Sequence, residues 1–431
     1  MKNLLQKTLA ILAKATIRRY QPVIIGITGS VGKTSTREAI YTVLKAKYRV
    51  RRSEKNYNTE IGVPLTILGV KHHGRNIIKW ISALIRVAIR ILIRAHEYPE
   101  ILVLEMGADR PGDIKYLVGI AKPFIAVMTA IGEIPAHVEF FSGPLELAEE
   151  KAELFKALPP DGFAVYNIDD EAVVEVKERT PARKTSFGFD EHANFRIANY
   201  EIRILAKDGK DTPDGVSFKI EHKESVVPIR LHDGFGKPQV YAAAAACSVG
   251  FLFRLNLVEI SQALEGYVPP PGRSRFLPGI KGSWIIDDSY NASPESTRAG
   301  LELLGKLPAR RRISVLGDML EIGKYTEEAH RVIGDYAAEV CDILFTVGDR
   351  AKFIADEARV KKTEVFVFDN PTDAGRKLDE ILREGDLVLV KGSQAMRLEK
   401  TVEEIMAEPE RAKELLVRQD EEWRRKVFLH T

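Results

Sequence analysis

One glycine-rich run constrains the fold of this chain more than any other feature, because it lies between two predicted regular elements. It reads Gly26-Ile-Thr-Gly-Ser-Val-Gly-Lys-Thr-Ser-Thr36, after the apolar residues Val23 to Ile27 and before a helical pattern over Ser35 to Ala46. A strand, a tight glycine turn and a helix in this order are typical of a phosphate-binding loop. Small residues let backbone N–H groups approach anionic oxygens, and the helix N-terminus adds positive potential. ATP is therefore the first ligand to consider.

The run matches a variant of the strict phosphate-loop pattern. The strict pattern places glycine five positions before Gly32, where Ile27 stands, and this chain has an extra glycine at Gly26 instead. In the phosphate-binding interpretation Lys33 reaches the terminal phosphates and the Thr34 hydroxyl ligates Mg²⁺. An ordinary glycine turn is the alternative. The predicted nucleotide-binding loop residues are Gly29, Ser30, Val31, Gly32, Lys33, Thr34 and Ser35.

Length and composition are those of a large globular protein. The 431 residues are 45% hydrophobic and 29% charged, which predicts two or three domains with substantial cores. A net charge of +3 is small for this length and gives no reason to expect nucleic-acid binding. Cys247 and Cys341 both lie in apolar runs, which favours buried thiols in a reducing compartment over a disulfide. We expect a cytoplasmic protein.

The first residues of the chain predict a helix and not a secretion signal. Lys7 and Lys14 interrupt the apolar residues of the segment 1–22, and no small-residue cleavage site follows them.

A second apolar segment, residues 77–94, predicts a basic amphipathic helix. It contains too many charges to span a bilayer. Two interpretations are open: a helix that packs its apolar face on the core and leaves its arginines in solvent, or a peripheral contact with a membrane surface. The arginines are Arg86, Arg90 and Arg94, and the opposite apolar face includes Trp80, Leu84 and Leu92.

Short apolar runs alternate with helical patterns along the chain, which predicts a doubly wound parallel sheet. The runs are VIIGIT, ILVLEM, FIAVMTAI and FAVYNI in the first part, and WIIDDS, RISVLG, DILFTV, EVFVFD and DLVLVKG in the second. Between them, alternating residues over about 186–231 predict an antiparallel patch, and an alanine-rich helix is expected over Tyr241 to Gly250. The predicted fold class is α/β, with a P-loop ATPase-type, mostly parallel sheet followed by a smaller Rossmann-like domain.

The run Val268-Pro-Pro-Pro-Gly-Arg273 marks the predicted domain boundary, because consecutive prolines block both helix continuation and sheet pairing. We divide the chain into an N-terminal helix (1–22), a central ATP-binding domain (23–270) and a C-terminal Rossmann-like domain (271–431). Open α/β sheets bind ligands beyond the carboxyl ends of their strands, and we expect the functional site there.

Three side chains near predicted strand ends are candidates for chemistry. Glu105 follows the run ILVL and can hold Mg²⁺ directly or through water, with a purely structural carboxylate as the alternative. His137 follows the run FIAVMTAI, and Lys151 lies in the helix after it. Taken alone, each of these two is equally well explained as a satisfied core residue or a surface residue.

Several ordered motifs resemble those of the Mur ligase superfamily, the ATP-dependent amide-forming enzymes of cell-wall precursor synthesis. The resemblance covers nearly the whole chain, and it is strongest to the type that joins D-alanyl-D-alanine to UDP-N-acetylmuramoyl-tripeptide. The motifs are ITGSVGKTST, the run Asn56-Tyr-Asn-Thr-Glu-Ile-Gly-Val-Pro64, LEMGADRPGDI (Leu104 to Ile114), AHVE, PGRSR, DDSYNASPES (Asp287 to Ser296), LGDMLEIG (Leu316 to Gly323) and VKGS (Val390 to Ser393).

The resemblance implies roles for the matched positions. The implied catalytic residues are Lys33, Glu105, His137, Lys151 and Arg273. The implied metal ligands are Thr34 and Glu105 for one Mg²⁺, and His137 with a carbamylated Lys151 for a second. An unmodified Lys151 on a solvated helix face is the alternative. The residues expected to reach the nucleotide from the second domain are Asp288, Tyr290 and Asn291, and the implied substrate-binding residues are Asn58, Thr59, Asp318, His330, Lys391 and Ser393.

The implied reaction passes through an acyl phosphate. ATP transfers its γ-phosphoryl group to a carboxylate, an amine attacks the acyl carbon, and an amide, ADP and phosphate result. Because several anions converge, two Mg²⁺ ions, Lys33 and Arg273 would offset their repulsion. The implied partners are small molecules: a UDP-sugar peptide or similar carboxylate, and D-alanyl-D-alanine or a similar amine. We expect a monomer.

Departures from the family pattern bear on the substrate. The separate N-terminal domain that binds the UDP-sugar in such enzymes has no counterpart in residues 1–22, and we expect it to be absent. The G-x-H-N-x-x-N-A stretch reads Gly236 to Ala243 here, and Ala130, Ser293 and Gln394 replace commoner residues, which leaves the adenine contacts open. The alternatives are a Mur-like ligase for another acid or amine, or a P-loop ATP-binding switch or scaffold without ligation.

Overall fold

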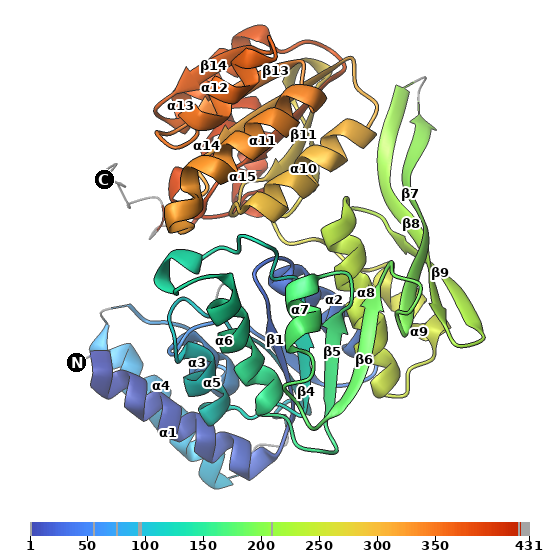
Figure 1. Cartoon of the computed structure of the whole chain (residues 1–431). Helices are drawn as coiled ribbons and strands as arrows, with labels where there is room; N and C mark the ends of the chain where they lie inside the picture. Colours follow the sequence, from blue (N-terminus) through green and yellow to red (C-terminus); the bar gives the residue numbers. More distant parts are fainter. Residues whose placement is uncertain are drawn as a thin grey trace.

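Two β-sheets, each covered by helices on both faces, organise the chain (Figure 1). The structure is a computed structural model that describes residues 2–54, 57–74, 76–93, 97–207, 210–420 and 423. Asn56 of the asparagine-containing motif and Arg94 of the predicted basic helix lie outside the described residues.

The first sheet has nine strands in the order β2-β3-β1-β4-β5-β6-β7-β8-β9. The first six are parallel, and β7, β8 and β9 pair antiparallel at one edge. The antiparallel patch therefore covers 195–231, because residues 186–188, which were expected in it, belong to the parallel strand β6. The parallel strands are β2 (Val50–Arg52), β3 (Ile101–Glu105), β1 (Val23–Thr28), β4 (Ile125–Met128), β5 (Phe163–Asn167) and β6 (Arg183–Gly188); the others are β7 (Phe195–Lys207), β8 (Lys210–His222) and β9 (Ser225–Leu231).

The second sheet has six strands in the order β10-β11-β15-β12-β13-β14, and all neighbours except β10 and β11 are parallel. Each of the nine apolar runs identified in the sequence forms a strand in one of the two sheets, which confirms the α/β class. The strands are β10 (Arg275–Pro278), β11 (Trp284–Asp288), β12 (Arg311–Gly317), β13 (Ile343–Val347), β14 (Glu364–Phe368) and β15 (Asp386–Lys391).

Helices cover both faces of each sheet. On the first sheet, one face holds α2 (Lys33–Leu44), α8 (Lys237–Leu252) and α9 (Leu257–Leu264), and the other holds α3 (Gly62–Leu68), α5 (Asp113–Ile120), α6 (Pro144–Lys156) and α7 (Glu171–Val176). On the second sheet, α10 (Pro294–Lys306), α11 (Thr326–Val340) and α12 (Lys352–Val360) cover one face, and α13 (Pro371–Ile381) and α14 (Glu399–Ile405) cover the other. The shorter elements are the helix α15 (Ala412–Leu415) and the 3₁₀ turns η1 (Val138–Phe140), η2 (Ile280–Gly282), η3 (Gly323–Tyr325), η4 (Gln394–Met396) and η5 (Pro409–Arg411).

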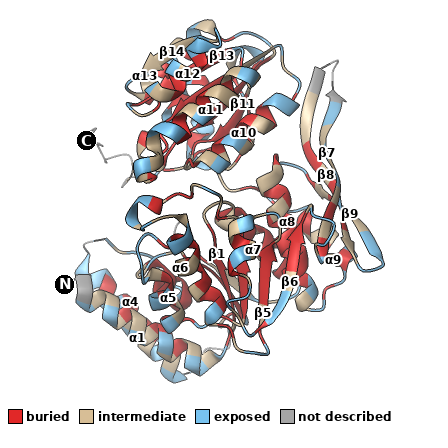
Figure 2. Ribbon diagram, in the orientation of Figure 1, coloured by how far each residue is buried: buried red, intermediate tan, exposed pale blue. Residues whose placement is uncertain are grey.

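Successive strand residues are divided between two apolar layers, because side chains alternate across a strand. In the central strand β1, Ile24 packs into one layer, while Ile25 and Ile27 pack into the other. Figure 2 shows the central strands buried and the outer helix faces exposed. A Cβ on Gly26 would lie 2.8 Å from Leu154 Cδ1 of α6. The extra glycine of the loop motif is thus explained by close packing behind the loop.

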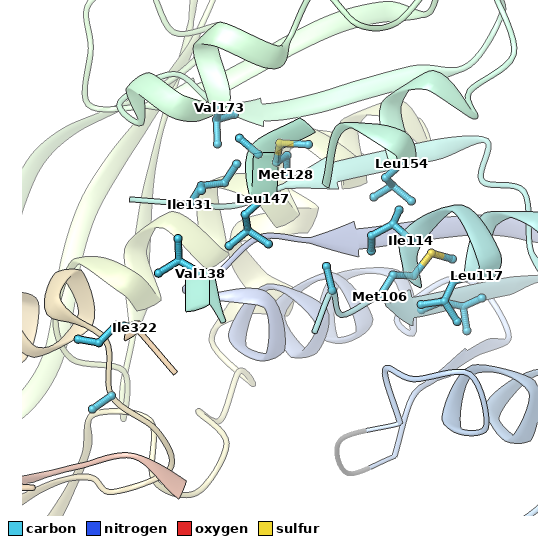
Figure 3. Packing of buried hydrophobic residues seen from close by; sticks show 14 of the residues in the cluster. Met106, Ile114, Leu117, Met128, Ile131, Val138, Leu147, Leu154, Val173 and Ile322 are labelled. Carbon is cyan, nitrogen blue, oxygen red and sulfur yellow. The ribbon is translucent and has the colours of Figure 1, made fainter. Parts of the chain in front are cut away.

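The two α/β units also share part of one apolar cluster. Val138 of η1 and Ile322, just before η3, both belong to it (Figure 3). The backbone N–H of Glu139 donates to the carbonyl of Glu321 at 3.3 Å. These contacts join the central unit to the C-terminal unit beside the cavity described below.

The basic helix agrees with its core-packing interpretation on one face only. In α4 (Ile77–Ile93) the buried side chains are Trp80, Ala83 and Val87, whereas a row of isoleucines is exposed. Helix α4 lies beside α1 (Lys2–Tyr20) at the side of the molecule away from the C-terminal unit (Figure 1). One apolar face of this helix packs on the core, where Trp80 and Val87 join the core cluster and Leu84 packs against it, but isoleucines as well as arginines are exposed to solvent. No described helix has both the length and the apolar character needed to cross a bilayer.

The buried position of Leu154 generates a stability prediction. Leu154→Ala removes buried apolar volume next to β1 and is expected to lower the free energy of unfolding by about 2–5 kcal/mol, measured by urea denaturation. Leu145→Ala, on the same helix but with its side chain exposed, should change it by less than about 0.5 kcal/mol. Equal losses in the two variants would contradict the packing described here.

Candidate active site

A cavity of about 780 Å³ lies at the junction of the two α/β units. Residues beyond the ends of β1, β3, β4, β11 and β15 line it, so both sheets contribute. It brings together twelve of the residues predicted from sequence. They are Ser30, Val31, Gly32, Lys33, Asn58, Thr59, Glu105, His137, Arg273, Tyr290, Asn291 and Ser393.

The glycine-rich loop follows β1 and ends at the first turn of α2. Gly29 has φ 141°, and a Cβ there would lie 2.0 Å from Thr129 Oγ1, so a larger residue would displace the loop. The backbone N–H groups of Ser30 and Val31 donate to the carbonyl of Ala130 at 2.7 and 3.1 Å. Because N–H groups in the first turn of a helix have no intrahelical acceptor, those at the start of α2 can serve an anion.

Lys33 lies within this loop. Its Nζ donates to the carbonyl oxygens of Gly29 at 2.7 Å and Ser30 at 3.3 Å. Burial lowers the pKa of Lys33, and Glu105 offsets part of that effect. Neutral carbonyls compensate a buried cation only partly, so the loop favours an anionic ligand beside Lys33.

Glu105 is held at the end of β3 by groups of α2. Thr34 Oγ1 donates to Glu105 Oε2 at 3.1 Å, and Arg37 Nη1 lies 3.2 Å from the same oxygen. From the second unit, Arg273 Nη2 donates to Thr34 Oγ1 at 3.3 Å. Arg37 was not identified from the sequence, although its position one helical turn after Lys33 places both on one face of α2.

Lys151 lies in α6, and only 1% of its surface is exposed to solvent. It is not among the residues that line the cavity. Burial, followed by the nearby charge of Lys33, lowers the pKa of Lys151 to about 7. Within the described ranges of the chain, its amine makes no hydrogen bond or close ion pair. The alternative that placed Lys151 on a solvated helix face is wrong, because the side chain is buried.

His137 joins the two units on the cavity wall. It has φ 71°, and its Nδ1 lies 2.8 Å from Glu321 Oε2 of the second unit. Its Nε2 lies 3.7 Å from Asp109 Oδ1. The contact with His137 holds the pKa of Glu321 below its usual range. Asp109 and Glu321 both lie in motifs noted in the sequence, but neither was singled out there.

On the second unit, the loop after β11 presents Tyr290 and Asn291 to the cavity. The Arg273 guanidinium lies 3.9 Å from the centre of the Tyr290 ring, a cation–π contact. Behind the loop, Lys391 Nζ donates to Asp288 Oδ2 at 2.6 Å and to the carbonyl of Asn291 at 3.0 Å. Asp288 and Lys391 therefore support the cavity wall and do not line it.

Asp318 and His330 also lie outside the cavity lining. Asp318 Oδ1 accepts a hydrogen bond from the backbone N–H of Ala351 at 2.8 Å. His330 Nε2 accepts from the N–H of Met319 at 3.0 Å, and burial lowers the pKa of His330 to about 4. A neutral His330 is thus part of the framework that positions the LGDMLEIG loop. Gly29, Thr34, Ser35 and Lys151 complete the predicted residues that do not line the cavity.

A second, smaller cavity of about 240 Å³ lies on the other side of the loop. Val31 and Gly32 line both cavities, so the two spaces adjoin across the loop. Asn167 and Tyr241 from the first unit and Glu295 from the second line the smaller one. Its lining residues come from six separate segments, which include Ala130 and part of the stretch Gly236 to Ala243 noted in the sequence.

Comparison with known proteins agrees with this architecture. The Mur ligase middle domain matches residues 27–79 and 84–250, and the family described as "Mur ligase, glutamate ligase domain" matches residues 272–394. These two matches cover most of the chain. The protein therefore belongs to the Mur ligase family, a class of ATP-dependent ligases, and the family resemblance noted in the sequence is confirmed.

Particular relatives are enzymes named UDP-N-acetylmuramoyl-tripeptide–D-alanyl-D-alanine ligase. The one from Bacillus subtilis (strain 168) is 31% identical over 402 residues, spanning 92% of this chain and 79% of that protein. The one from Mycobacterium tuberculosis (strain H37Rv) is 31% identical over 411 residues, spanning 89% and 73%. The crystal structure of MurF ligase from Thermotoga maritima in complex with ADP has a TM-score of 0.75 at 29% identity, covering 93% of this chain and 83% of that one.

The buried amine of Lys151 generates a pH prediction. The amine in the folded protein loses its proton near pH 7, whereas in the unfolded chain it keeps the proton up to about 10.5. Burying the charged amine therefore lowers the free energy of unfolding by its full amount below about pH 7. This destabilisation decreases as the pH rises above 7. We expect Lys151→Met to raise the free energy of unfolding most at about pH 6 and less at about pH 9.

Urea denaturation without nucleotide, metal ion or bicarbonate measures this difference. Lys156→Met is the matched control, because Lys156 lies on the same helix with its side chain 40% exposed in ion pairs. Its effect on unfolding should vary little across the same range. A Lys151→Met effect of equal size at both pH values would contradict a lowered pKa.

Proposed function

We propose that this protein joins D-alanyl-D-alanine to UDP-N-acetylmuramoyl-tripeptide, or to a closely similar carboxylate, in an ATP-dependent step of peptidoglycan precursor synthesis. The observation that carries the proposal is the cavity shared by the two units, which is lined by the loop lysine Lys33 and by Arg273, whose guanidinium reaches Thr34 of the same loop. The names of the relatives at 31% identity supply the substrate pair. We therefore assign to this protein the small-molecule substrates that the names of these relatives state.

The loop at the start of α2 is proposed to bind the ATP phosphates. Lys33 and the first N–H groups of α2 converge on one side of the cavity, where anionic oxygens would replace the carbonyl partners of Lys33. The smaller cavity adjoins the loop at Val31 and Gly32, and we place the adenine base there. A related enzyme crystallised with ADP supports use of this nucleotide.

The residues around Thr34 fit a Mg²⁺ ion. The Thr34 hydroxyl and the Glu105 carboxylate lie within 3.1 Å of each other, and hydroxyl and carboxylate oxygens are the donors that Mg²⁺ prefers. We therefore propose Thr34 and Glu105 as ligands of a first Mg²⁺. When bound, such an ion neutralises phosphate charge and polarises the phosphoryl oxygens.

Lys151 fits a carbamate better than a free ammonium group. Carbamylation needs the neutral amine, whose nitrogen attacks the carbon of CO₂ and releases a proton, and Lys151 is neutral for a large fraction of molecules near pH 7. The product is an anion with two oxygen donors in a site where Lys33 contributes positive charge. We propose that carbamylated Lys151 and His137 are the side chains available to a second Mg²⁺.

The chain's own residues can promote acyl transfer by charge neutralisation. Lys33 and Arg273 place positive charge on the γ-phosphoryl group as it moves to the substrate carboxylate, which forms an acyl phosphate and releases ADP. The amine then attacks the acyl carbon, loses a proton, and expels inorganic phosphate as the amide forms. Asn58 and Thr59, with Ser393 opposite, line the space left for the two substrates.

Closure of the two units would keep water from the acyl phosphate. The contacts between η1 and η3 and between His137 and Glu321 lie at the edge of the cavity, and Gly272 in the linker has φ 67°. A Cβ on Gly272 would lie 3.0 Å from the backbone nitrogen of Tyr290. The linker thus holds Arg273 close to both units, and opening around it would admit substrates.

Phosphate release tests the function. With ATP, Mg²⁺, UDP-N-acetylmuramoyl-tripeptide and D-alanyl-D-alanine all present, we expect turnover that falls to background when either the acid or the amine is omitted. Lys33→Ala should reduce turnover by at least about a hundredfold, because the transferred phosphoryl group loses its buried cation. Lys45→Ala, an exposed lysine at the other end of α2, should leave turnover unchanged.

Three outcomes would contradict the proposal. Turnover that ignores both substrates would indicate an ATP-dependent switch, and turnover only with another acid or amine would indicate a different ligase. Undiminished activity of Lys33→Ala would remove the loop from the mechanism.

Carbamylation of Lys151 has its own test. We expect isotope-labelled bicarbonate to give one carbamate carbon signal in the NMR spectrum of wild-type protein at about pH 8, where the amine is mostly neutral. Lys151→Ala should lack the signal and lose ligase activity, and an added short-chain carboxylic acid should restore part of that activity. Lys156→Ala is the control that keeps the signal. A Lys151→Ala protein of normal activity would contradict the role.

A further inference from the structure

Helix α4 exposes a continuous apolar stripe. Its members recur every three or four residues, so they share one face of the helix, and each has between 47% and 80% of its surface exposed. Such a row on one short helix is unusual for a surface that faces only water. The stripe consists of Ile78, Ile81, Ile85, Ile89 and Leu92.

The two helices at this surface, α1 and α4, contain basic residues and no acidic residues. The segments 2–20 and 77–93 contain eight Lys and Arg residues and no Asp or Glu, whereas the whole chain has 64 basic and 61 acidic residues. On α4 the cations are Lys79, Arg86 and Arg90, which flank the isoleucines. Apolar residues bordered by basic residues on an amphipathic helix favour an interface rich in anionic lipid.

The helix is held in place at both ends. Near its start, Trp80 Nε1 donates to the carbonyl of Gly74 at 3.1 Å, and His72 and His73 meet the Trp80 ring edge-on. Near its end, Tyr20 OH of α1 donates to the carbonyl of Arg90 at 2.6 Å. The apolar stripe is therefore presented on a fixed support.

The first of these anchors connects α4 to the cavity. His72 and Gly74, just before α4, line the cavity together with Asn58 and Thr59. The match to the Mur ligase middle domain starts after α1 and is interrupted at residues 80–83, inside α4. Helix α1 therefore precedes the matched region, whereas most of α4 lies within it, and α4 begins next to the wall where the proposed substrates bind.

We propose that α4, supported by α1, is a peripheral docking surface for an anionic lipid bilayer, with the isoleucine stripe in the headgroup region and the flanking cations on lipid phosphates. A helix that lies in the interface buries its apolar face without crossing the membrane, in keeping with its length. A second copy of the chain fits less well, because a twofold interface would set the same cations against each other. Resting on the proposed ligase function, docking would bring the cavity to substrates made or consumed at a membrane.

Vesicle flotation of the full-length protein tests the docking. We expect it to float with vesicles of phosphatidylcholine and phosphatidylglycerol at least about tenfold more than with phosphatidylcholine alone, and less as salt screens the charges. Ile81→Gln, Ile85→Gln and Ile89→Gln together should reduce flotation at least about tenfold. Arg86→Gln with Arg90→Gln should reduce binding to the anionic vesicles about tenfold.

Matched controls come from the C-terminal unit. Val332→Gln with Val360→Gln replaces exposed apolar residues, and Arg359→Gln with Arg376→Gln replaces exposed basic ones. Both should float as wild type. Thermal melting checks that every variant is folded, and the triple isoleucine variant should keep wild-type phosphate release with water-soluble substrates.

The results separate this proposal from the catalytic one, since flotation needs no substrate or turnover. Wild-type protein that floats with neither vesicle, or a triple isoleucine variant that floats equally well, would overturn the docking. A wild-type dimer in sedimentation that the triple variant converts to a monomer, without lipid binding, would assign the stripe to a second copy and also overturn it.

Discussion

The site buries two lysine side chains, Lys33 and Lys151. Only an anionic ligand can fully offset the free-energy cost of removing their positive charges from water. Lys33 contacts two backbone carbonyls, Lys151 has no close partner in the described part of the chain, and Glu105 is shared between Thr34 and Arg37. Removing such charges from water is costly, and fixed partial charges repay it incompletely. The pKa values of Lys33 and Lys151 are lowered because burial disfavours their charged forms. A triphosphate and a carbamate are anions of the kind that would relieve it.

This constraint also explains why the site needs two units. The loop after β1 supplies Lys33, and the linker supplies Arg273, whose guanidinium reaches Thr34 on one side and the Tyr290 ring on the other. Contacts at η1 and η3 close the edge of the same cavity. Because Arg273 contacts both units, its charge reaches the loop in this arrangement of the units. Closure and charge neutralisation are thus one event in the proposed mechanism.

The two basic helices, α1 and α4, differ from the rest of the fold in how their apolar residues are exposed. Elsewhere the isoleucines of parallel strands are buried between helix layers, as Ile25 and Ile27 are, while those of α4 face outward. Their support by Trp80, Gly74 and Tyr20 fixes the exposed face relative to the cavity. The docking surface proposed for lipid and the proposed substrate wall therefore adjoin each other. Helix α4 would thus link the proposed ligase reaction in the cavity to the proposed position of the protein at a membrane surface.

The sequence by itself determined the α/β class, nine of the strands and the order of the family motifs, because short apolar runs and glycine turns are local properties that each segment carries alone. It also named twelve of the residues that line the cavity, from the glycine-rich loop, the ends of predicted parallel strands and the family motifs. Only the tertiary structure decided that Lys151 is buried, that Asp288 and Lys391 pair behind the wall, that Glu321 meets His137, and that the isoleucines of α4 are exposed. Burial and pairing depend on which distant segments pack together, and no local spacing in a single chain encodes that.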